Sequence, residues 1–409
     1  MRPISLLLLT LISISSISSF AEPNSKNRYL QENLVANHAR YAPTFQQDAR
    51  FINAWGIAIR PAGAGGHFWV TAKDKSFEYV GDVQASPEAG LQRLFQDALK
   101  EITLPVGGEN QFATGTVFSG SKTDFVVTQT LDNGESVTAP AKFLFASDGG
   151  VVSAWTERVN ADGSKSFPSH AETVIDLSAQ GAQFFGIALN HDFSRMYLAD
   201  FGKVPGIRVF DGTFKPIEVS FDNPFDRNKN GKVDAGEYAP FNVQAFNTPS
   251  GEPHIFVAYA KTQKCPKPDI KAGTCGKGEI FPGEEDTEKA GSGRLAEFTE
   301  DGKLVALWKD ASKLNAPWGM AFAPQNFGAL SNSLLVANFG DGTIAAYNAE
   351  TRRFIDVLRN AKGKPVKIDK VWGLLFGNGA SLGDSNALYF AAGPRDEEDG
   401  VFGSLRVAE

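Results

Sequence analysis

The sequence predicts an all-β fold, a β-propeller of about six blades, on three observations. Short apolar runs with the composition of strands recur along nearly the whole chain. Turns rich in Gly, Asp and Asn separate these runs, and the 41 glycines suit many turns better than long helices. An aromatic residue followed by Gly and an apolar run returns several times. Recurrence of one four-stranded unit is the signature of a propeller.

The clearest copy of the unit lies between Asn315 and Leu358. It opens with Pro-Trp-Gly, and a Gly-Asp-Gly turn at 340–342 joins two of its strands. The four expected strands are Met320–Ala323, Ser333–Asn338, Thr343–Tyr347 and Phe354–Leu358.

Five weaker units are expected elsewhere, opening near Asn53-Ala54-Trp55-Gly56, Phe112, Phe184-Phe185-Gly186, Pro240-Phe241-Asn242 and Val371-Trp372-Gly373. The second unit is expected to include Phe125–Thr128 as a strand, and Gln84–Leu99 to be a loop with a helical turn. We expect Trp55, Trp318 and Trp372 to pack in the core between blades.

The last unit has only three expected strands, so the strand within Asn27–Asn37 is expected to supply the fourth and close the ring. A β-solenoid is the alternative fold. The units are spaced irregularly and exceed the length of a solenoid repeat, which favours the propeller.

The N-terminus has the pattern of a signal peptide, residues 1–21. Arg2 precedes an apolar run, Ile4–Ile17, and Ser19-Phe20-Ala21 forms a small-x-small cleavage site. The run is short and rich in serine for a membrane span. We expect cleavage after Ala21, a periplasmic or extracellular location, and one propeller domain over residues 27–409 without a membrane span.

The formal net charge of −7, without a cluster of Lys and Arg, argues against a nucleic-acid partner. The expected partner is an unidentified protein, glycan or small molecule, and the expected state is a monomer.

Cys265 and Cys275 enclose a short loop within an expected insertion at about 261–293. In an oxidising compartment a disulfide is favoured, and loop closure gives roughly 2.7 kcal/mol of stabilisation at most. Two free thiols are the alternative. A zinc site is disfavoured, because His254 is the only histidine nearby.

Residues 226–237 match the twelve-residue EF-hand calcium loop at each diagnostic position. Gly231 permits the sharp turn, and Val233 is expected to pack beneath the loop. Calcium prefers six to eight oxygen ligands, which this spacing supplies. The expected ligands are the side chains of Asp226, Asn228, Asn230, Asp234 and Glu237 and the backbone carbonyl of Lys232.

Pro224 and Pro240 flank the loop, so long helices on both sides are not expected. No second loop of this kind occurs in the sequence. We therefore expect a structural Ca²⁺ bound with a Kd on the order of 10⁻⁴ to 10⁻³ M, as in extracellular modules. The alternative is a polar Asn/Gly turn without an ion.

Several runs together resemble a bacterial family of secreted propeller-like proteins that is frequent in PEP-CTERM-bearing genomes. The family has no assigned activity, so the resemblance implies fold and compartment only. In its pattern a short turn leads directly into the run at 238–242, which implies that the calcium loop is an insertion. Many relatives end in a PEP-CTERM anchor, whereas this chain ends at Glu409 without one, and release as a soluble protein is expected. The runs are NAWGIA and FWVT, APFNVQ, NAPWGMAFAPQNFG with LLVANFGDGTIAAYN, and VWGLLFGNG with LYFAAGP and GVFG.

No catalytic set is recognisable in the sequence. Gly63–Gly66 opens no helix, and the acidic runs Glu284–Glu288 and Asp396–Asp399 are expected to be solvated loops. The histidines lie in unrelated contexts: His38, His67, His170, His191 and His254. The polar residues at unit openings and strand ends are expected to cap turns: Asn53, Asp200, Asn242, Asn315 and Asn338.

Two functions remain open. The first is a non-enzymatic binding module with a structural calcium ion. The second is a calcium-dependent hydrolase of lactonase or esterase type with its site in the central channel. Oxygen atoms of carboxylates and amides that converge on the axis would favour the hydrolase, whereas an axis lined by glycine and aromatic residues would favour the binding module.

Overall fold

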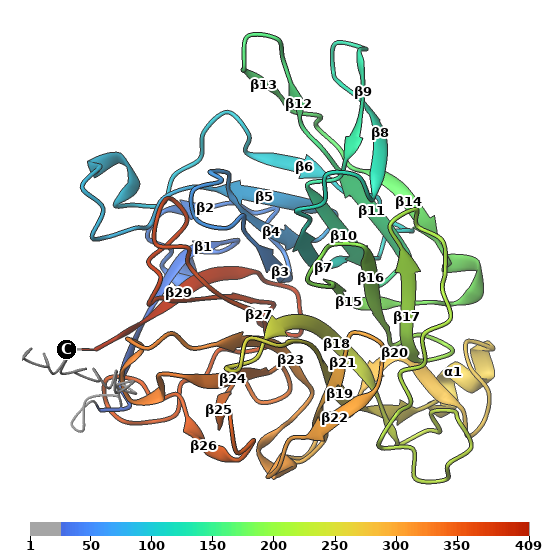
Figure 1. The fold of residues 1–409 in the computed structure, drawn as a ribbon. Helices are drawn as coiled ribbons and strands as arrows, with labels where there is room; N and C mark the ends of the chain where they lie inside the picture. The colour runs from blue at the N-terminus through green and yellow to red at the C-terminus, as the bar shows by residue number, and fades with distance from the viewer. Residues whose placement is uncertain (1–25, 409) are drawn as a thin grey trace, which may run out of the picture.

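The strands form six sheets of three to five strands, arranged as the blades of a propeller around one axis (Figure 1). This computed structural model describes residues 26–408, so the predicted signal peptide and its cleavage site lie outside the described residues. Within 26–408, none of the helices has the length and apolar character needed to span a membrane. The predicted propeller of about six blades is confirmed.

In the first five blades the sheet is antiparallel and its first strand in the sequence lies nearest the axis; in the sixth, β27 is innermost, and β1 and β2 form the outer edge as a parallel pair. The first blade consists of β3 (Ala54–Ala58), β4 (Phe68–Ala72), β5 (Lys75–Tyr79) and β6 (Glu101–Thr103). The second consists of β7 (Ala113–Phe118), β10 (Phe143–Ser147), β11 (Val151–Trp155) and β14 (Glu172–Asp176). The third consists of β15 (Phe184–Leu189), β16 (Arg195–Asp200) and β17 (Gly206–Asp211). The fourth blade consists of β18 (Tyr238–Asn247), β19 (Pro253–Lys264), β21 (Gly293–Thr299) and β22 (Leu304–Leu307). The fifth consists of β23 (Pro317–Phe322), β24 (Ser333–Asn338), β25 (Ile344–Asn348) and β26 (Phe354–Val357). The sixth consists of β27 (Val371–Phe376), β28 (Leu388–Ala392), β29 (Val401–Val407), β1 (Tyr29–Ala36) and β2 (Gln46–Gln47).

The inner strands form a closed ring. β3 contacts β7, and the contacts continue through β15, β18, β23 and β27 back to β3. Figure 1 shows these strands gathered around the centre of the molecule. The inner strands of all six blades therefore surround the same axis.

The N-terminal strand closes the ring, as predicted. β1 pairs antiparallel with β29, in a register that runs from Tyr29 opposite Val407 to Ala36 opposite Val401. The ring of Tyr29 stacks on Phe327 of the fifth blade at a centroid distance of 4.6 Å, and its hydroxyl donates to the Phe327 carbonyl at 2.8 Å. Strand β1 thus joins the last two blades.

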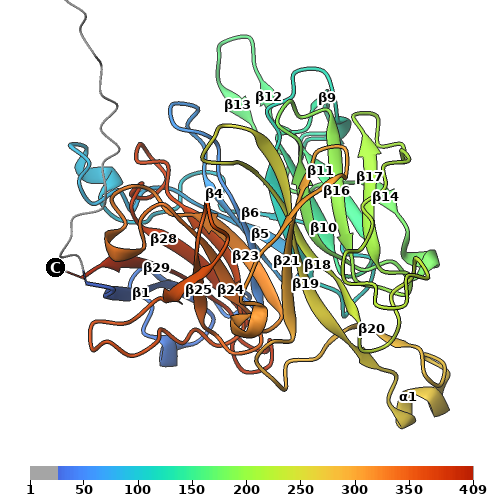
Figure 2. The ribbon, with the colours of Figure 1, turned by 60° about the horizontal axis from the view of Figure 1, so that its bottom comes forward.

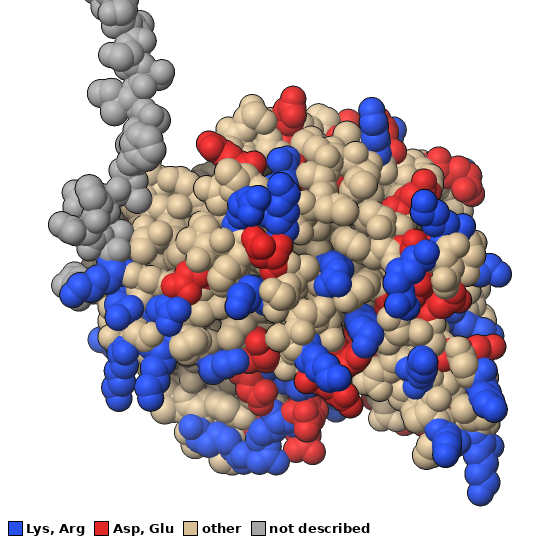
Figure 3. Space-filling view, turned by 90° about the horizontal axis from the view of Figure 1, so that it is seen from below, with Lys and Arg blue, Asp and Glu red and all other residues tan. Residues whose placement is uncertain are grey.

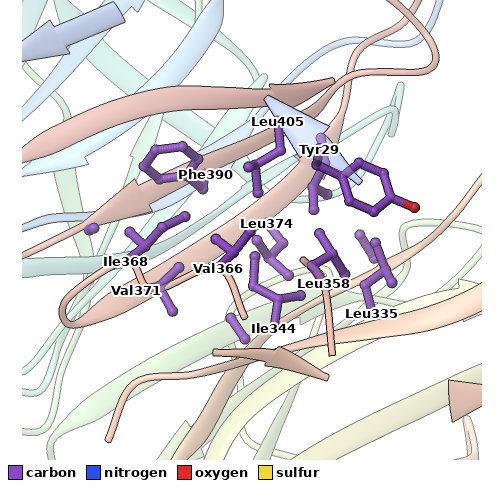
Figure 4. Packing of buried hydrophobic residues seen from close by; sticks show 14 of the residues in the cluster. Tyr29, Leu335, Ile344, Leu358, Val366, Ile368, Val371, Leu374, Phe390 and Leu405 are labelled. Carbon is purple, nitrogen blue, oxygen red and sulfur yellow. The ribbon is translucent and has the colours of Figure 1, made fainter. Parts of the chain in front are cut away.

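The core lies between neighbouring blades rather than within any one of them. Figure 4 shows the cluster between the fifth and sixth blades, where Leu335 and Ile344 meet Leu374 and Phe390. Equivalent clusters fill the other five gaps between blades. Since each strand alternates its side chains between two faces, every blade contributes to two such clusters.

One strand expected in the second unit was assigned wrongly, and two further connections lie outside the regular blades. Phe125–Thr128 is not a blade strand: β8 (Val126–Thr130) pairs with β9 (Ser136–Pro140) in a separate hairpin, because residues 132–134 (Asp-Asn-Gly) turn the chain back on itself. A second small hairpin joins β12 (Arg158–Val159) to β13 (Lys165–Ser166), and both project from the ring (Figure 1). The third blade ends after three strands, and the chain runs on from it into the calcium loop.

Helical segments are short in the described residues. The α-helix α1 (Lys267–Ala272) and the strand β20 (Ile280–Glu285) belong to the segment between β19 and β21, which extends from the body in Figure 2. The segment 84–99 contains one 3₁₀ turn, as expected. The 3₁₀ turns are Ala39–Tyr41, Ala89–Leu91, Ser178–Gln180, Ala311–Lys313 and Gly328–Leu330.

Candidate functional site

The first half of the calcium loop is folded around the side chain of Asp226. One carboxylate oxygen accepts hydrogen bonds from the backbone N–H groups of Asn228 at 3.1 Å and Lys229 at 2.7 Å. The other accepts from the N–H of Gly231 at 2.8 Å. Gly231 has φ +73°, a conformation that glycine adopts without steric strain. The Asp-x-Asn-x-Asn-Gly spacing therefore produces the tight turn that it predicts.

The second half brings the other expected ligand side chains together. The side-chain amides of Asn228 and Asn230 donate to the same oxygen of Asp234, at 2.8 and 3.1 Å. The Asn228 amide also lies 3.5 Å from an oxygen of Glu237. A 180° rotation of each amide group would exchange the positions of its oxygen and nitrogen. The asparagine side chains can therefore direct oxygen ligands at the same cation.

Glu237 is the most confined of these residues. Its side chain is fully buried, and within residues 26–408 its one ion pair is with the exposed Arg227, at 3.3 Å between Nε and Oε1. The backbone N–H of Asp234 donates to its other oxygen at 3.2 Å. A buried carboxylate is normally paired or bound to a metal. The position that the sequence assigns to a bidentate ligand thus holds a buried acid whose one ionic partner is on the surface.

Lys232 and Val233 link the two halves of the loop. The Lys232 side chain is exposed, and its backbone N–H donates to the side chain of Asn230 at 2.9 Å. Val233 packs against an aromatic cluster on the propeller axis. The loop is therefore attached to the centre of the ring as well as to the start of β18.

In this structure the expected ligand atoms of the loop do not all surround one position for an ion. In residues 26–408, no three Asp, Glu, His or Cys side chains lie close enough together to hold a metal ion between them. Calcium binding at 226–237 would have to include the asparagine oxygens and the Lys232 carbonyl, with a small contraction of the loop. The donor set suits a hard cation that takes six to eight oxygens.

The disulfide is confirmed, and it lies near this loop. Cys265 and Cys275 are bonded across α1. β19 runs from the fourth blade towards Cys265, and on the way Thr262 contacts the loop: its backbone N–H donates to the Glu237 carbonyl at 2.8 Å, and its hydroxyl donates to the same oxygen at 3.1 Å. The hairpin of β19 and β20 thus supports the last residue of the calcium loop.

The axis itself is narrow because glycine occupies one equivalent position on five of the six inner strands. A Cβ atom at any of them would collide with atoms of the next inner strand. On β18 the position is taken by Asn242, whose side-chain oxygen lies over Gly186. The five glycines are Gly56, Gly115, Gly186, Gly319 and Gly373.

Aromatic side chains fill the axis at the end where the inner strands begin. Trp55 and Trp372 stack with ring centroids 3.8 Å apart, and Trp372 lies 4.0 Å from Phe339. Rings of non-adjacent blades also touch, for example Trp55 and Phe185 at 5.3 Å. The tryptophans are buried, as expected, but they contact one another across the axis instead of lying only between neighbouring blades. We call this set the axial aromatic cluster: Trp55, Phe185, Phe201, Phe241, Trp318, Phe339 and Trp372.

The polar residues at unit openings and strand ends do not converge on the axis. Asn53 accepts a hydrogen bond from the indole of Trp372 at 2.9 Å, and Asp200 pairs with Arg208 of its own blade at 2.6 Å. Asn315 and Asn338 hydrogen-bond with each other within the fifth blade, at 3.0 Å. Each of them organises a turn or a neighbouring blade. The pattern that would favour a hydrolase is not formed by these residues.

A cavity of about 400 Å³ opens at the other end of the axis, and we call it the axial cavity. The inner strands of all six blades line it. Its lining is mostly aliphatic and aromatic, with a few amide side chains. The calcium loop and this cavity therefore lie at opposite ends of the axis, separated by the axial aromatic cluster.

Four of the histidines pair with acids in separate places. His67 lies 2.9 Å from Asp97, and burial lowers the pKa of its imidazole. His254 lies 2.7 Å from the buried Glu297. His170 and His191 pair with carboxylates at the surface, and His38 caps the first 3₁₀ turn. None of these contacts includes a nucleophile in the described residues.

The acidic runs are not simply solvated, and this expectation was wrong for several of their members. Asp399 is buried and accepts hydrogen bonds from Asn37 and Tyr41. Glu285 and Glu397 are partly buried, and the charge of Glu397 raises the pKa of Glu285 and of Asp148. Burial first, and then the charge of Glu397, raises the pKa of Glu285 to about 8. Burial raises the pKa of Glu397, and that of Asp148 in the turn between β10 and β11, to about 7. We call Asp148, Glu285 and Glu397 the acidic rim; their proximity depends on ring closure, which local sequence does not reveal.

The distribution of charged side chains on the surface does not indicate a class of partner. On the face shown in Figure 3, Lys and Arg side chains are interspersed with Asp and Glu. Mixed charge of this kind is ordinary for a soluble surface and points to no polyanionic partner.

No family model matches the sequence. The uncharacterized protein R648 of Acanthamoeba polyphaga mimivirus is 28% identical over 375 residues, which cover 91% of this chain and 78% of the viral protein. The uncharacterized mimivirus protein L690 is 28% identical over 240 residues, 58% of this chain and 56% of that protein. These similarities extend through most of the chain but bring no activity with them.

Among solved structures, the soluble aldose sugar dehydrogenase of Escherichia coli superposes with a TM-score of 0.43 at 13% identity, covering 93% of this chain and 100% of that one. A glucose dehydrogenase superposes with a TM-score of 0.44 at 14% identity, covering 93% and 99%. Scores this low carry no argument about activity. The fold assignment rests on the strand pairing described above.

Proposed function

We propose that this chain is a secreted propeller that binds calcium at residues 226–237 and acts as a binding module for another molecule. The observation that carries the calcium proposal is Glu237, a fully buried carboxylate placed beside the oxygen-bearing side chains of Asn228 and Asp234. A hard divalent cation would satisfy its charge in a way that an exposed arginine does not.

Binding is favoured over hydrolysis by what lies on the axis. The inner strands carry glycines at their closest approach and aromatic rings below it, which is the pattern expected of the binding module. Two of the amide side chains that line the axial cavity, those of Asn242 and Gln244, hydrogen-bond to the fifth blade.

Secretion belongs to the same proposal. The disulfide is compatible with an oxidising compartment, and the apolar N-terminal run suits export. We also propose a distant relationship to the bacterial family of secreted propellers, which is supported by the repeated aromatic-Gly runs and the closing runs of the chain.

Chemical unfolding tests the role of Glu237. For the chain from residue 22 to 409, 10 mM calcium should raise the free energy of unfolding over that in chelator by about 1–3 kcal/mol, given a Kd of 10⁻⁴ to 10⁻³ M. Glu237→Gln should abolish this increase. In chelator the variant should be at least as stable as the wild type, because a neutral amide replaces a buried charge.

Glu288→Gln, which changes an exposed acid outside the loop, is the matched control and should respond to calcium as the wild type does. A calcium response retained in Glu237→Gln would show that the ion binds elsewhere, and the proposed role of the loop would be wrong.

A further inference from the structure

The axial cavity is a shared product of the six inner strands. Its floor contains Gly56, Gly115 and Gly373, where the absence of side chains leaves space, together with Asn242 and Trp318. Its volume of about 400 Å³ lies within the range of small-molecule sites, which is about 300–1,000 Å³. A macromolecule could reach only the rim of a cavity of this size, so a small molecule is the occupant that fits.

The wall of the cavity is apolar and its rim is aromatic. Ile57, Ile187 and Leu374 line the wall from three different blades. Phe118 and Phe246 line it further along their strands. Such a surface gains about 25 cal/mol for each Å² of apolar ligand surface that it removes from water.

The lining carries no unpaired charged group. Among the residues around the cavity, the acid is Glu300, the histidines are His191 and His254, and Lys and Arg do not occur. Glu300 is paired with His191 at 2.8 Å, and His254 is paired with the buried Glu297 at 2.7 Å. A charged ligand would lose its hydration without gaining a counter-charge, so the occupant should be uncharged.

One polar group at the wall has no partner. The hydroxyl oxygen of Thr116 is buried and makes no hydrogen bond within the described residues. By contrast, Gln244 is held in place, since its oxygen accepts from the N–H of Met320 at 2.7 Å and its amide donates to the Met320 carbonyl at 3.2 Å. The Thr116 oxygen has no exposed surface, so it is not a contact for a ligand, and the cavity selects its occupant by its apolar lining.

We infer that the axial cavity binds one small, uncharged molecule with an apolar body. This inference rests on the proposed role as a binding module and names the chemical class of its ligand. The calcium loop, at the other end of the axis, is not part of this site.

An uncharged fluorescent probe tests the inference. Prodan, a naphthalene with a ketone and a tertiary amine, is uncharged and has the required apolar body. In 10 mM calcium it should bind the wild-type chain at one site, with a blue shift of its emission. Anilinonaphthalene sulfonate, a charged naphthalene, should bind at least ten times more weakly.

Two variants locate the probe. Ala245→Trp places a large side chain in the cavity and should weaken Prodan binding at least tenfold. Ala64→Trp adds the same bulk at an exposed position and should change nothing.

The result that overturns the inference is Prodan binding of equal strength in the wild type and Ala245→Trp, or equal affinity for the charged and uncharged probes. Calcium titration of Ala245→Trp should match the wild type and shows that the variant is folded. Absence of Prodan binding in a protein that binds calcium would reject the ligand class while leaving the calcium proposal intact.

Discussion

Asn242 is the residue at which the sixfold pattern of the axis is broken. The sequence runs around Trp55, Phe185, Trp318 and Trp372 place Gly directly after the aromatic residue, whereas Phe241 is followed by asparagine. The structure gives the reason, because the Asn242 amide donates to the Trp318 carbonyl at 2.8 Å and bridges the fourth and fifth blades. The substitution is visible in the sequence, but its contact depends on the next blade.

Residues differ in how well the sequence predicts them. The hydrogen bonds of Asp226 join it to residues two to five positions away, so the loop motif already implies them. The acidic rim is the opposite case. Asp148 and Glu397 are far apart in the sequence, yet the charge of Glu397 raises the pKa of Asp148.

The acidic rim predicts a pH dependence of stability. Its carboxyls have folded-state pKa values of about 7 for Asp148 and Glu397 and about 8 for Glu285, above those of the unfolded chain. The unfolded state therefore ionises first as the pH rises, and folding stability should fall between about pH 5 and pH 8. The thermal midpoint, measured in chelator across this range, should decrease with pH.

Glu285→Gln should flatten this dependence, because its amide does not titrate. Glu288→Gln, at an exposed position nearby, should keep the slope of the wild type. An identical slope in Glu285→Gln and the wild type would contradict the burial assigned to this carboxyl.

Among the strands, the local sequence was sufficient to predict those blade strands that are bounded by polar turns. β24, β25 and β26 were predicted to within a few residues, because polar turns bound each run. β8 was assigned to the wrong sheet, because a hairpin strand outside a blade has the same alternation as one inside it. The packing of Thr262 against the calcium loop had no sequence signal, since 25 residues separate it from Glu237.

That contact predicts coupling between the disulfide and calcium binding. The disulfide holds the end of the β19–β20 hairpin, and Thr262 of β19 holds the carbonyl of Glu237. Replacing both cysteines by serine removes the loop-closure stabilisation, roughly 2.7 kcal/mol at most, from this segment. The variant should bind calcium several-fold more weakly in a direct titration.

Thr262→Val should weaken calcium binding in the same direction, with the disulfide intact. Equal affinities in the double serine variant and the wild type would show that the hairpin and the loop are energetically independent, in spite of their contact.

For the whole molecule, six repeats and a missing last strand were enough to predict a closed ring. The repeats differ in length. The sequence also could not show which side chains fill the axis. The division into an aromatic end, which carries the calcium loop, and an open end with a cavity exists only once all six inner strands meet. That division is the basis of both functional proposals.

Ring closure depends on the N-terminal strand, and Tyr29 is its anchor. Its ring is buried against Phe327, and its hydroxyl is hydrogen-bonded. Tyr29→Ala should lower the free energy of unfolding by about 3–5 kcal/mol, as for other large aromatic residues in a core. Tyr29→Phe, which keeps the ring, should cost only about 0.5–1.5 kcal/mol. Similar losses in both variants would contradict the packing role.

The central claim is that residues 226–237 bind calcium, and calorimetric titration of the chelator-stripped chain from residue 22 to 409 tests it most directly. The wild type should show one site with a Kd on the order of 10⁻⁴ to 10⁻³ M, and the Asp226→Ala/Glu237→Ala variant should show none. No binding in the wild type, or an unchanged site in the variant, would contradict the claim.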